Sequence, residues 1–148
     1  MEKEKINITA IQMESIIADK QANFDKIKKL FKENIKPNTD IVVLPELWNV
    51  GWACDKFIEA SEEIETSETI SLLSELAQKY NVNILGGSFV NKVNDKYYNT
   101  CPVINRAGKL VATYNKNHLY SYYDDSEGTY ITRGDNPVIV DLEGIKIG

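Results

Sequence analysis

The chain alternates between two patterns of hydrophobic and polar positions. Residues 6–13 place apolar side chains at nearly every second position, which predicts a strand with one buried face. Residues 40–45 form a short, β-branched apolar run that ends at a proline and predicts a buried strand. Residues 83–90 are expected to form a third strand.

Two amphipathic helices are expected between these strands. Residues 19–35 carry apolar side chains at spacings of roughly 3.6 positions, and Pro37 lies just beyond them. Residues 67–80 repeat the pattern, with Ser67 as the expected N-cap. The order strand, helix, strand, helix, strand predicts an α/β domain in which helices cover a sheet.

The second half of the chain has a different pattern. Strands are expected at 97–105, 109–116 and 137–142, and turn-forming residues rather than helices separate them. Hairpins therefore replace crossover helices. Residues 144–148 show a turn followed by the opening of a further strand. We find no repeat and no linker composition, so we expect 1–148 to form one structural unit.

The composition narrows the range of partners and compartments. The 148 residues include 17 Lys and Arg against 22 Asp and Glu, a net charge of −5, without the basic stripe that nucleic-acid binding needs. No apolar run approaches the roughly 20 residues of a membrane span. Two cysteines are too few for a disulfide framework. We therefore expect a cytoplasmic protein that binds neither nucleic acid nor membrane.

Glu46 is the first candidate for chemistry. It directly follows the predicted strand 40–45, where burial would favour uptake of a proton near neutral pH. From position alone, a surface acid after a strand is the simpler interpretation. The loop that follows is less ordinary, because it holds two tryptophans, Trp48 and Trp52, and a glycine.

Lys116 is the second candidate. It ends an alternating segment, so Tyr114, Lys116 and His118 would share one face if the strand continues. An inward lysine beside a glutamate could form an ion pair or stabilise an oxyanion, although an exposed lysine is the simpler interpretation. His118 is the single histidine and makes a weak metal site, so a structural hydrogen bond is expected instead.

The two cysteines are weak candidates for a nucleophile. Thiolate chemistry needs a base, access and a lowered pKa. Cys101 lies inside a predicted strand, where a cysteine is usually a small core residue. Cys54 follows the aromatic loop after Glu46 and has no other support.

Several ordered segments resemble motifs of the nitrilase superfamily of carbon–nitrogen hydrolases. Residues 42–51 resemble the glutamate motif of that family, and residues 114–119 resemble its lysine motif. Between them, residues 86–88 and 98–100 also follow the family pattern. Glu127 resembles the additional glutamate that lies near the lysine in these enzymes. The likeness spans essentially the whole chain and is nearest to the ω-amidase-like members.

The resemblance implies a fold and a mechanism. The fold would be an α-β-β-α sandwich, with 1–148 as the N-terminal portion of a single domain. The activity would be cleavage of the amide of a small carboxylic acid through a cysteine thioester, without a metal or a cofactor. In that scheme Glu46 is the general base, Lys116 stabilises the oxyanion, and Glu127 supports the lysine and positions the substrate.

The nucleophile is the point at which the chain departs from that family. Neither Cys54 nor Cys101 occupies the family's cysteine motif, which is expected a few residues beyond residue 148. The chain as given should therefore be inactive, and the inner face of its sheet should be uncovered. For the full-length protein the resemblance implies a homo-oligomer.

Other classes of function stay open at this point. A non-catalytic binding domain or an assembly partner could keep the same pocket. Neither has a chemical reason to keep both Glu46 and Lys116, so the pair favours an enzyme. Within the family, nitriles and N-carbamoyl compounds are alternative substrates to amides.

Overall fold

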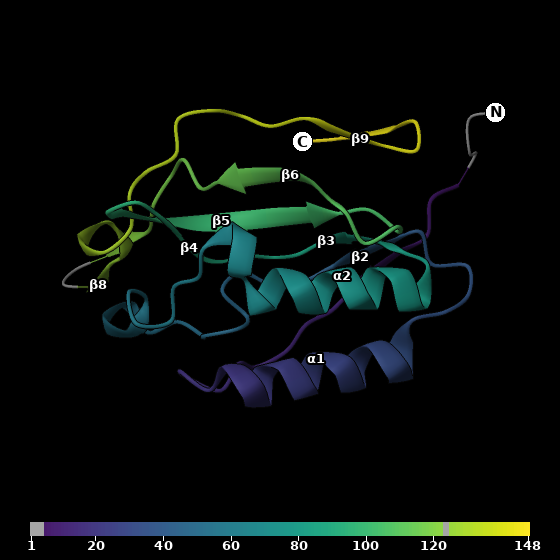
Figure 1. Ribbon diagram of the computed structural model, residues 1–148, viewed down its shortest axis with the longest axis horizontal. Coiled ribbons are helices and arrows are strands. Elements are labelled where there is room, and N and C mark those ends of the chain that lie inside the picture. Colours follow the sequence, from purple (N-terminus) through teal and green to yellow (C-terminus); the bar gives the residue numbers. More distant parts are fainter. Residues whose placement is uncertain (1–4, 123–124) are drawn as a thin grey trace.

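The computed structural model describes residues 5–122 and 125–148. Two helices lie side by side on one side of a mixed sheet, and a β-hairpin lies on the other side (Figure 1). The active-site candidates come from the loops at one end of this sheet. None of the helices in the described ranges is long and apolar enough to span a membrane.

The main sheet has six strands in the described residues. Its first strands, β1, β2 and β3, are parallel, and β5 runs antiparallel to β3, β4 and β6. The change from parallel to antiparallel pairing confirms that hairpins replace crossover helices in the second half. The strands are β1 (Ile8–Ala10), β2 (Ile41–Val43), β3 (Asn83–Leu85), β4 (Phe89–Val93), β5 (Lys96–Ile104) and β6 (Leu110–Asn115).

Both predicted helices are confirmed. α1 (Lys20–Asn34) begins after Asp19, whose side chain accepts a hydrogen bond from a backbone N–H of the first turn. α2 (Glu68–Tyr80) begins after Ser67, the predicted N-cap, whose hydroxyl accepts from the Ile70 N–H at 3.0 Å. The apolar stripes of both helices pack against one face of the sheet and form the main core. That core includes Phe24, Ile27, Phe31, Val42, Trp48, Leu73, Leu76, Ile84 and Phe89.

The remaining elements are short. A separate hairpin is formed by β9 (Val140–Leu142) and β10 (Ile145–Ile147), which confirms the strand opening predicted at the end of the chain. Strand β9 is shorter than the predicted 137–142. The sequence pattern missed the two-residue strands and the single 3₁₀ turns, because neither is long enough to show a period. These are β7 (Ser121–Tyr122), β8 (Asp125–Ser126), η1 (Cys54–Lys56), η2 (Ile64–Thr66) and η3 (Glu127–Thr129).

The predicted strand 83–90 is interrupted by a β-bulge. Its two halves, β3 and β4, both pair with β5, but the three residues 86–88 stand opposite only two residues of β5. Gly87 lies in this bulge with φ of +64°, and a Cβ there would come within 1.9 Å of the Pro45 carbonyl oxygen. A glycine is therefore required at this position, because the turn after β2 passes directly over it.

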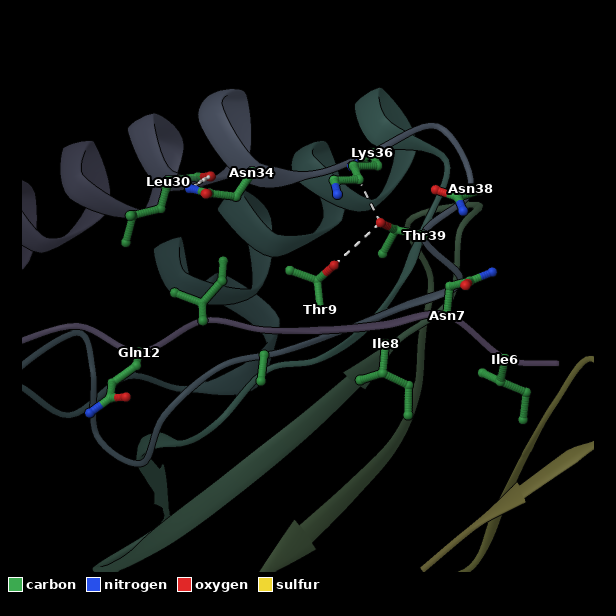
Figure 2. Close-up of a pocket in the computed structure, with 12 residues that line it drawn as sticks. Ile6, Asn7, Ile8, Thr9, Gln12, Leu30, Asn34, Lys36, Asn38 and Thr39 are labelled. Atoms are coloured by element: carbon green, nitrogen blue, oxygen red, sulfur yellow. Dashed lines mark hydrogen bonds between the residues drawn. The ribbon is translucent and has the colours of Figure 1, made fainter.

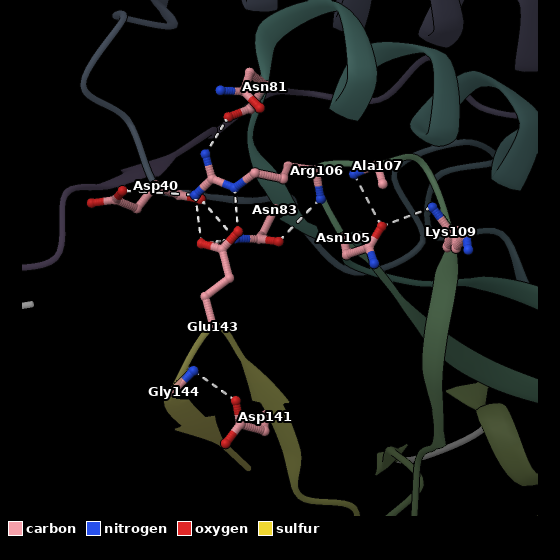
Figure 3. Close-up of polar contacts among 10 residues, drawn as sticks. All are labelled: Asp40, Asn81, Asn83, Asn105, Arg106, Ala107, Lys109, Asp141, Glu143 and Gly144. Carbon is pink, nitrogen blue, oxygen red and sulfur yellow. Dashed lines mark hydrogen bonds and ion pairs between the residues drawn. The ribbon is translucent and has the colours of Figure 1, made fainter. Parts of the chain in front are cut away.

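Arg106 ties the β9–β10 hairpin to the sheet (Figure 3). Its guanidinium donates to both carboxylate oxygens of Glu143, which lies in the hairpin turn, and to the Asn81 carbonyl oxygen at 2.7 Å. Asn83 also donates to Glu143 at 3.4 Å and accepts from the Arg106 N–H at 3.1 Å. This bidentate contact fixes the hairpin turn over the ends of β2 and β3 that lie away from Glu46.

Part of the sheet face opposite the helices is exposed. Ile6 and Ile8 point away from α1 (Figure 2), and they are 39% and 60% exposed. Ala10 continues this exposed row along β1, whereas Ile11 faces the helices and is 8% exposed. The prediction that the inner face is uncovered is therefore confirmed at β1.

We predict that this apolar row limits the solubility of the 148-residue chain. The double variant Ile6→Thr/Ile8→Thr should reduce self-association in sedimentation velocity, because it removes exposed apolar surface. The matched control is Ile11→Thr on the same strand, which should lower the free energy of unfolding by about 1–3 kcal/mol because it buries a hydroxyl in the core. A monomeric wild-type chain that unfolds cooperatively would contradict this prediction.

Candidate active site

The turn after β2 presents Glu46 and is held by the β-bulge. The Leu47 N–H donates to the Ser88 hydroxyl at 2.9 Å, and the Trp48 indole N–H donates to the Gly86 carbonyl oxygen at 2.9 Å. Leu47 has φ of +48°, an uncommon backbone conformation for leucine that these contacts maintain. The Glu46 side chain is 48% exposed, so the expectation of a buried carboxylate at this position was wrong. The physical reason is that β2 ends at Val43 and Glu46 opens a turn in which the next side chains, Leu47 and Trp48, take the buried positions instead.

The loop after Glu46 is held in place by the buried carboxylate of Glu62. Glu62 accepts hydrogen bonds from the Asn49 side chain at 3.2 Å and from the Thr69 hydroxyl at 2.6 Å. Burial alone would raise the pKa of Glu62, but hydrogen bonds from Ser67 and Thr69, with the nearby Lys20, lower it below its usual value. A charged Glu62 therefore joins the Glu46 loop to the start of α2.

Lys116 lies immediately after β6, and its main chain is held on two sides. Its N–H donates to the Asn99 carbonyl oxygen at 2.9 Å, and its carbonyl oxygen accepts from the Gly134 N–H at 2.9 Å. The side chain is 24% exposed. Its ammonium lies 2.7 Å from Oε1 of Glu46 and 2.9 Å from Oε2 of Glu127. The structure therefore brings the three predicted site residues together.

Glu127 is completely buried, with 0% of its side chain exposed. One carboxylate oxygen, Oε2, accepts from Lys116 and from the Tyr120 N–H at 2.9 Å. The other, Oε1, accepts from the Asn99 side-chain amide at 2.7 Å. Both oxygens are therefore engaged, which holds the Glu127 carboxylate in one orientation.

Glu46 is engaged through one oxygen only. Its Oε1 accepts from Lys116 and from the Asn99 amide at 2.8 Å. In the part of the chain that the structure describes, no hydrogen bond reaches its Oε2. A half-exposed carboxylate with one free oxygen can accept a proton from a group that approaches from solvent or from a substrate pocket.

The two carboxylates control the ionisation of Lys116. Burial alone would lower the pKa of Lys116, but hydrogen bonds and charge attraction from Glu46 and Glu127 outweigh it and raise the pKa above its usual value. The ammonium is therefore fully charged at neutral pH. Because the folded-state pKa is raised, its stabilising contribution is present at neutral pH and is lost only as the pH rises through that raised value.

Aromatic side chains line one side of the ammonium. Lys116 Nζ lies 5.7 Å from the centroid of the Trp52 ring, within cation–π range. Trp52 makes edge-to-face contacts with Phe57 and Tyr120, at ring-centroid distances of 5.8 and 5.4 Å. Trp48, by contrast, is 0% exposed and belongs to the core, so of the two loop tryptophans only Trp52 borders the site.

Cys101 borders the site as a neutral thiol, and Cys54 lies in a separate apolar cluster. Cys101 lines a cavity of about 320 Å³ together with Glu46 and Lys116, but burial raises the pKa of its thiol to about 11. It is therefore protonated at neutral pH. Cys54 is buried in a second apolar cluster with Phe57 and other side chains. His118 is exposed beyond the end of β6, so the face that it was expected to share with Lys116 does not continue.

A larger cavity lies elsewhere and contributes no catalytic groups. It measures about 750 Å³ and lies between β1 and the C-terminal end of α1 (Figure 2). Its lining is formed by residues 6–12, Leu30, Asn34, Lys36, Asn38 and Thr39, none of which lines the cavity beside Glu46. Among the described residues, no group of three or more His, Cys, Asp or Glu side chains could hold a metal ion.

Asn99 and Ser88 are the site residues that the sequence analysis did not single out. Both lie in segments that resemble the family pattern, but nothing in hydrophobic periodicity separates a bridging amide from any other polar strand residue. The resemblance at residues 86–88 and 98–100 was the available signal.

We predict that Glu46→Gln and Glu127→Gln each lower the pKa of Lys116, because each removes one negative charge beside the ammonium. The measurement is NMR titration of the Lys116 side chain in the 148-residue chain. Glu63→Gln, which changes an exposed carboxylate paired with Lys92, is the matched control and should leave the titration unchanged. An unchanged Lys116 titration in both site variants would contradict the arrangement.

The chain is similar to known proteins over most of its length. The family model for carbon-nitrogen hydrolases matches residues 7–148. The chain is 34% identical over 153 residues to the chloroplastic omega-amidase of Arabidopsis thaliana, covering 97% of this chain and 41% of that protein. It is 30% identical over 142 residues to the 2-oxoglutaramate amidase of Bacillus subtilis, covering 96% of this chain and 53% of that protein.

Solved structures show the same fold. The crystal structure of Saccharomyces cerevisiae Nit3, a member of branch 10 of the nitrilase superfamily, matches with a TM-score of 0.80 at 29% identity. The match covers 95% of this chain and 53% of that one. The chain thus spans about half the length of these relatives. Because the family model covers nearly all of its residues, this chain belongs to the carbon-nitrogen hydrolase family.

Proposed function

We propose that this chain is the N-terminal portion of an amidase that cleaves the amide of a small carboxylic acid through a cysteine thioester. The observation that carries the proposal is the contact of Lys116 with both Glu46 and Glu127, at 2.7 and 2.9 Å. These residues come from three separate segments of the chain. Folding alone does not require that their charged side chains meet. The amidase names of the relatives support the same reaction class.

In the proposed mechanism Glu46 is the general base. Its unpartnered Oε2 takes the proton of the cysteine thiol, and the thiolate forms a C–S bond with the amide carbonyl carbon. The tetrahedral intermediate then breaks its C–N bond, and ammonia leaves with the proton that Glu46 had accepted. Glu46 next takes a proton from water, whose oxygen attacks the thioester. The C–S bond then breaks, the acid is released, and the thiolate takes back the proton that Glu46 holds.

Lys116 stabilises the oxyanion of both tetrahedral intermediates. Its ammonium is held charged by Glu46 and Glu127, which raise its pKa. A side chain that is 24% exposed still has one side open to a substrate. Glu127 supports this role, because its complete burial and its fixed hydrogen bonds hold the ammonium in one place.

The nucleophile is proposed to follow β10. Gly134 is hydrogen-bonded to Lys116, and the chain runs from Gly134 along the sheet to the turn at Glu143. Strand β10 then returns antiparallel to β9 (Figure 1). A chain that continues in this direction approaches the end of the sheet where Glu46 and Lys116 lie. We therefore place the catalytic cysteine a few residues beyond Gly148.

The alternatives differ in their chemistry. A nitrilase or an N-carbamoyl hydrolase would use the same Glu46 and Lys116, so the site geometry favours none of the three substrates. The names of the relatives favour amides. A binding domain or an assembly partner would not require the free oxygen on Glu46. For the full-length protein we further propose a cytoplasmic location and a homo-oligomeric state.

We predict that the longer protein releases ammonia from dicarboxylic acid monoamides, and that Glu46→Gln or Lys116→Ala abolishes trapping of the thioester. Glutamine cannot take the thiol proton, and alanine cannot stabilise the oxyanion. The measurements are ammonia release across amides, nitriles and N-carbamoyl compounds, and mass spectrometry of the acyl-enzyme. Cys101→Ser and the exposed Glu59→Gln are controls that should stay active. Normal thioester formation in either site variant would refute the assigned roles.

A further inference from the structure

Asn99 contacts all three of the charged residues of the site. It lies on β5, is 3% exposed, and its side-chain nitrogen donates to Oε1 of Glu46 at 2.8 Å and to Oε1 of Glu127 at 2.7 Å. Its backbone carbonyl oxygen accepts from the Lys116 N–H at 2.9 Å. One residue in the interior of a strand thus connects the turn after β2, the start of η3 and the end of β6.

We propose that Asn99 is a positioning residue that decides which oxygen of Glu46 acts as the base. A primary amide has two N–H groups, and each of them here serves a different carboxylate. Oε1 of Glu46 is therefore occupied by both Asn99 and Lys116. The carboxylate cannot rotate to exchange its two oxygens without breaking both contacts, so Oε2 stays directed toward the reacting groups.

The chemical identity of an amide is what this position requires. Two carboxylates held near one ammonium repel each other, and the charge of Lys116 offsets only one of them. A second cation in place of Asn99 would neutralise the site and weaken Glu46 as a base. An aspartate would add a third negative charge, and a serine would supply one donor instead of two. Asparagine supplies two donors without changing the net charge.

This inference rests on the proposed amidase function and adds a residue to its machinery. Asn99 acts through Glu46 in both half-reactions, because the same oxygen must take the proton of the thiol and then the proton of water. Loss of the amide should therefore lower kcat for acylation and deacylation alike. It should leave KM nearly unchanged, because Asn99 reaches the substrate only through the two carboxylates.

The test compares two nearly isosteric variants in the longer protein, Asn99→Leu and Asn99→Asp. Asn99→Leu should lower kcat by about 10²-fold at every pH, since Glu46 loses its fixed orientation. Asn99→Asp should lose more activity as the pH rises, because the ionised aspartate has no donor and repels both carboxylates. Asn91→Leu is the matched control: Asn91 is also 3% exposed and lies on the neighbouring β4, and it contacts none of the three charged residues.

The outcomes separate this inference from the proposed function. Wild-type kcat in Asn99→Leu, or the same pH-independent loss in both variants, would overturn the positioning role. In the 148-residue chain, NMR titration gives a second readout that needs no activity: Asn99→Asp should raise the pKa of Lys116 further, and Asn91→Leu should not change it. An inactive wild-type enzyme with this NMR response would refute the proposed function and leave the Asn99 bridge intact.

Discussion

Lys116 carries one positive charge that two carboxylates share, and the arrangement of the site depends on that shared charge. Without it, Glu46 and Glu127 could not be held close together in a partly buried position. The sharing is unequal, because Glu127 is buried with both oxygens engaged and Glu46 is half exposed with one oxygen free. The same charge thus holds one carboxylate in place and leaves the other able to react.

The backbone around this charge is fixed by contacts between turns and strands rather than by regular secondary structure. The bulge at residues 86–88 holds the turn that carries Glu46, and the loop contact at Gly134 holds Lys116. Glu62 then joins the loop after Glu46 to the start of α2. Each catalytic candidate lies just beyond the end of a strand, so its direction is set by these tertiary hydrogen bonds.

The other end of the sheet fixes a different part of the molecule. Arg106 and Glu143 hold the β9–β10 hairpin turn there, which sets the direction in which β10 returns toward the site. The face of β1 beside this hairpin keeps Ile6 and Ile8 exposed. The structure thus has a complete helix-covered core on one side of the sheet and an incomplete apolar layer on the other.

The sequence by itself determined the two helices, the order of strands and helices along the chain, and the choice of Glu46, Lys116 and Glu127 as candidates. Periodicity located the helices and strands because burial imposes it over many residues, and motif order located the three charged residues. Only the tertiary structure decided that strand 83–90 is bulged, that Glu46 is exposed, and that Asn99 bridges both carboxylates. These features depend on contacts between segments far apart in the chain, and such contacts leave no local period or spacing in the sequence.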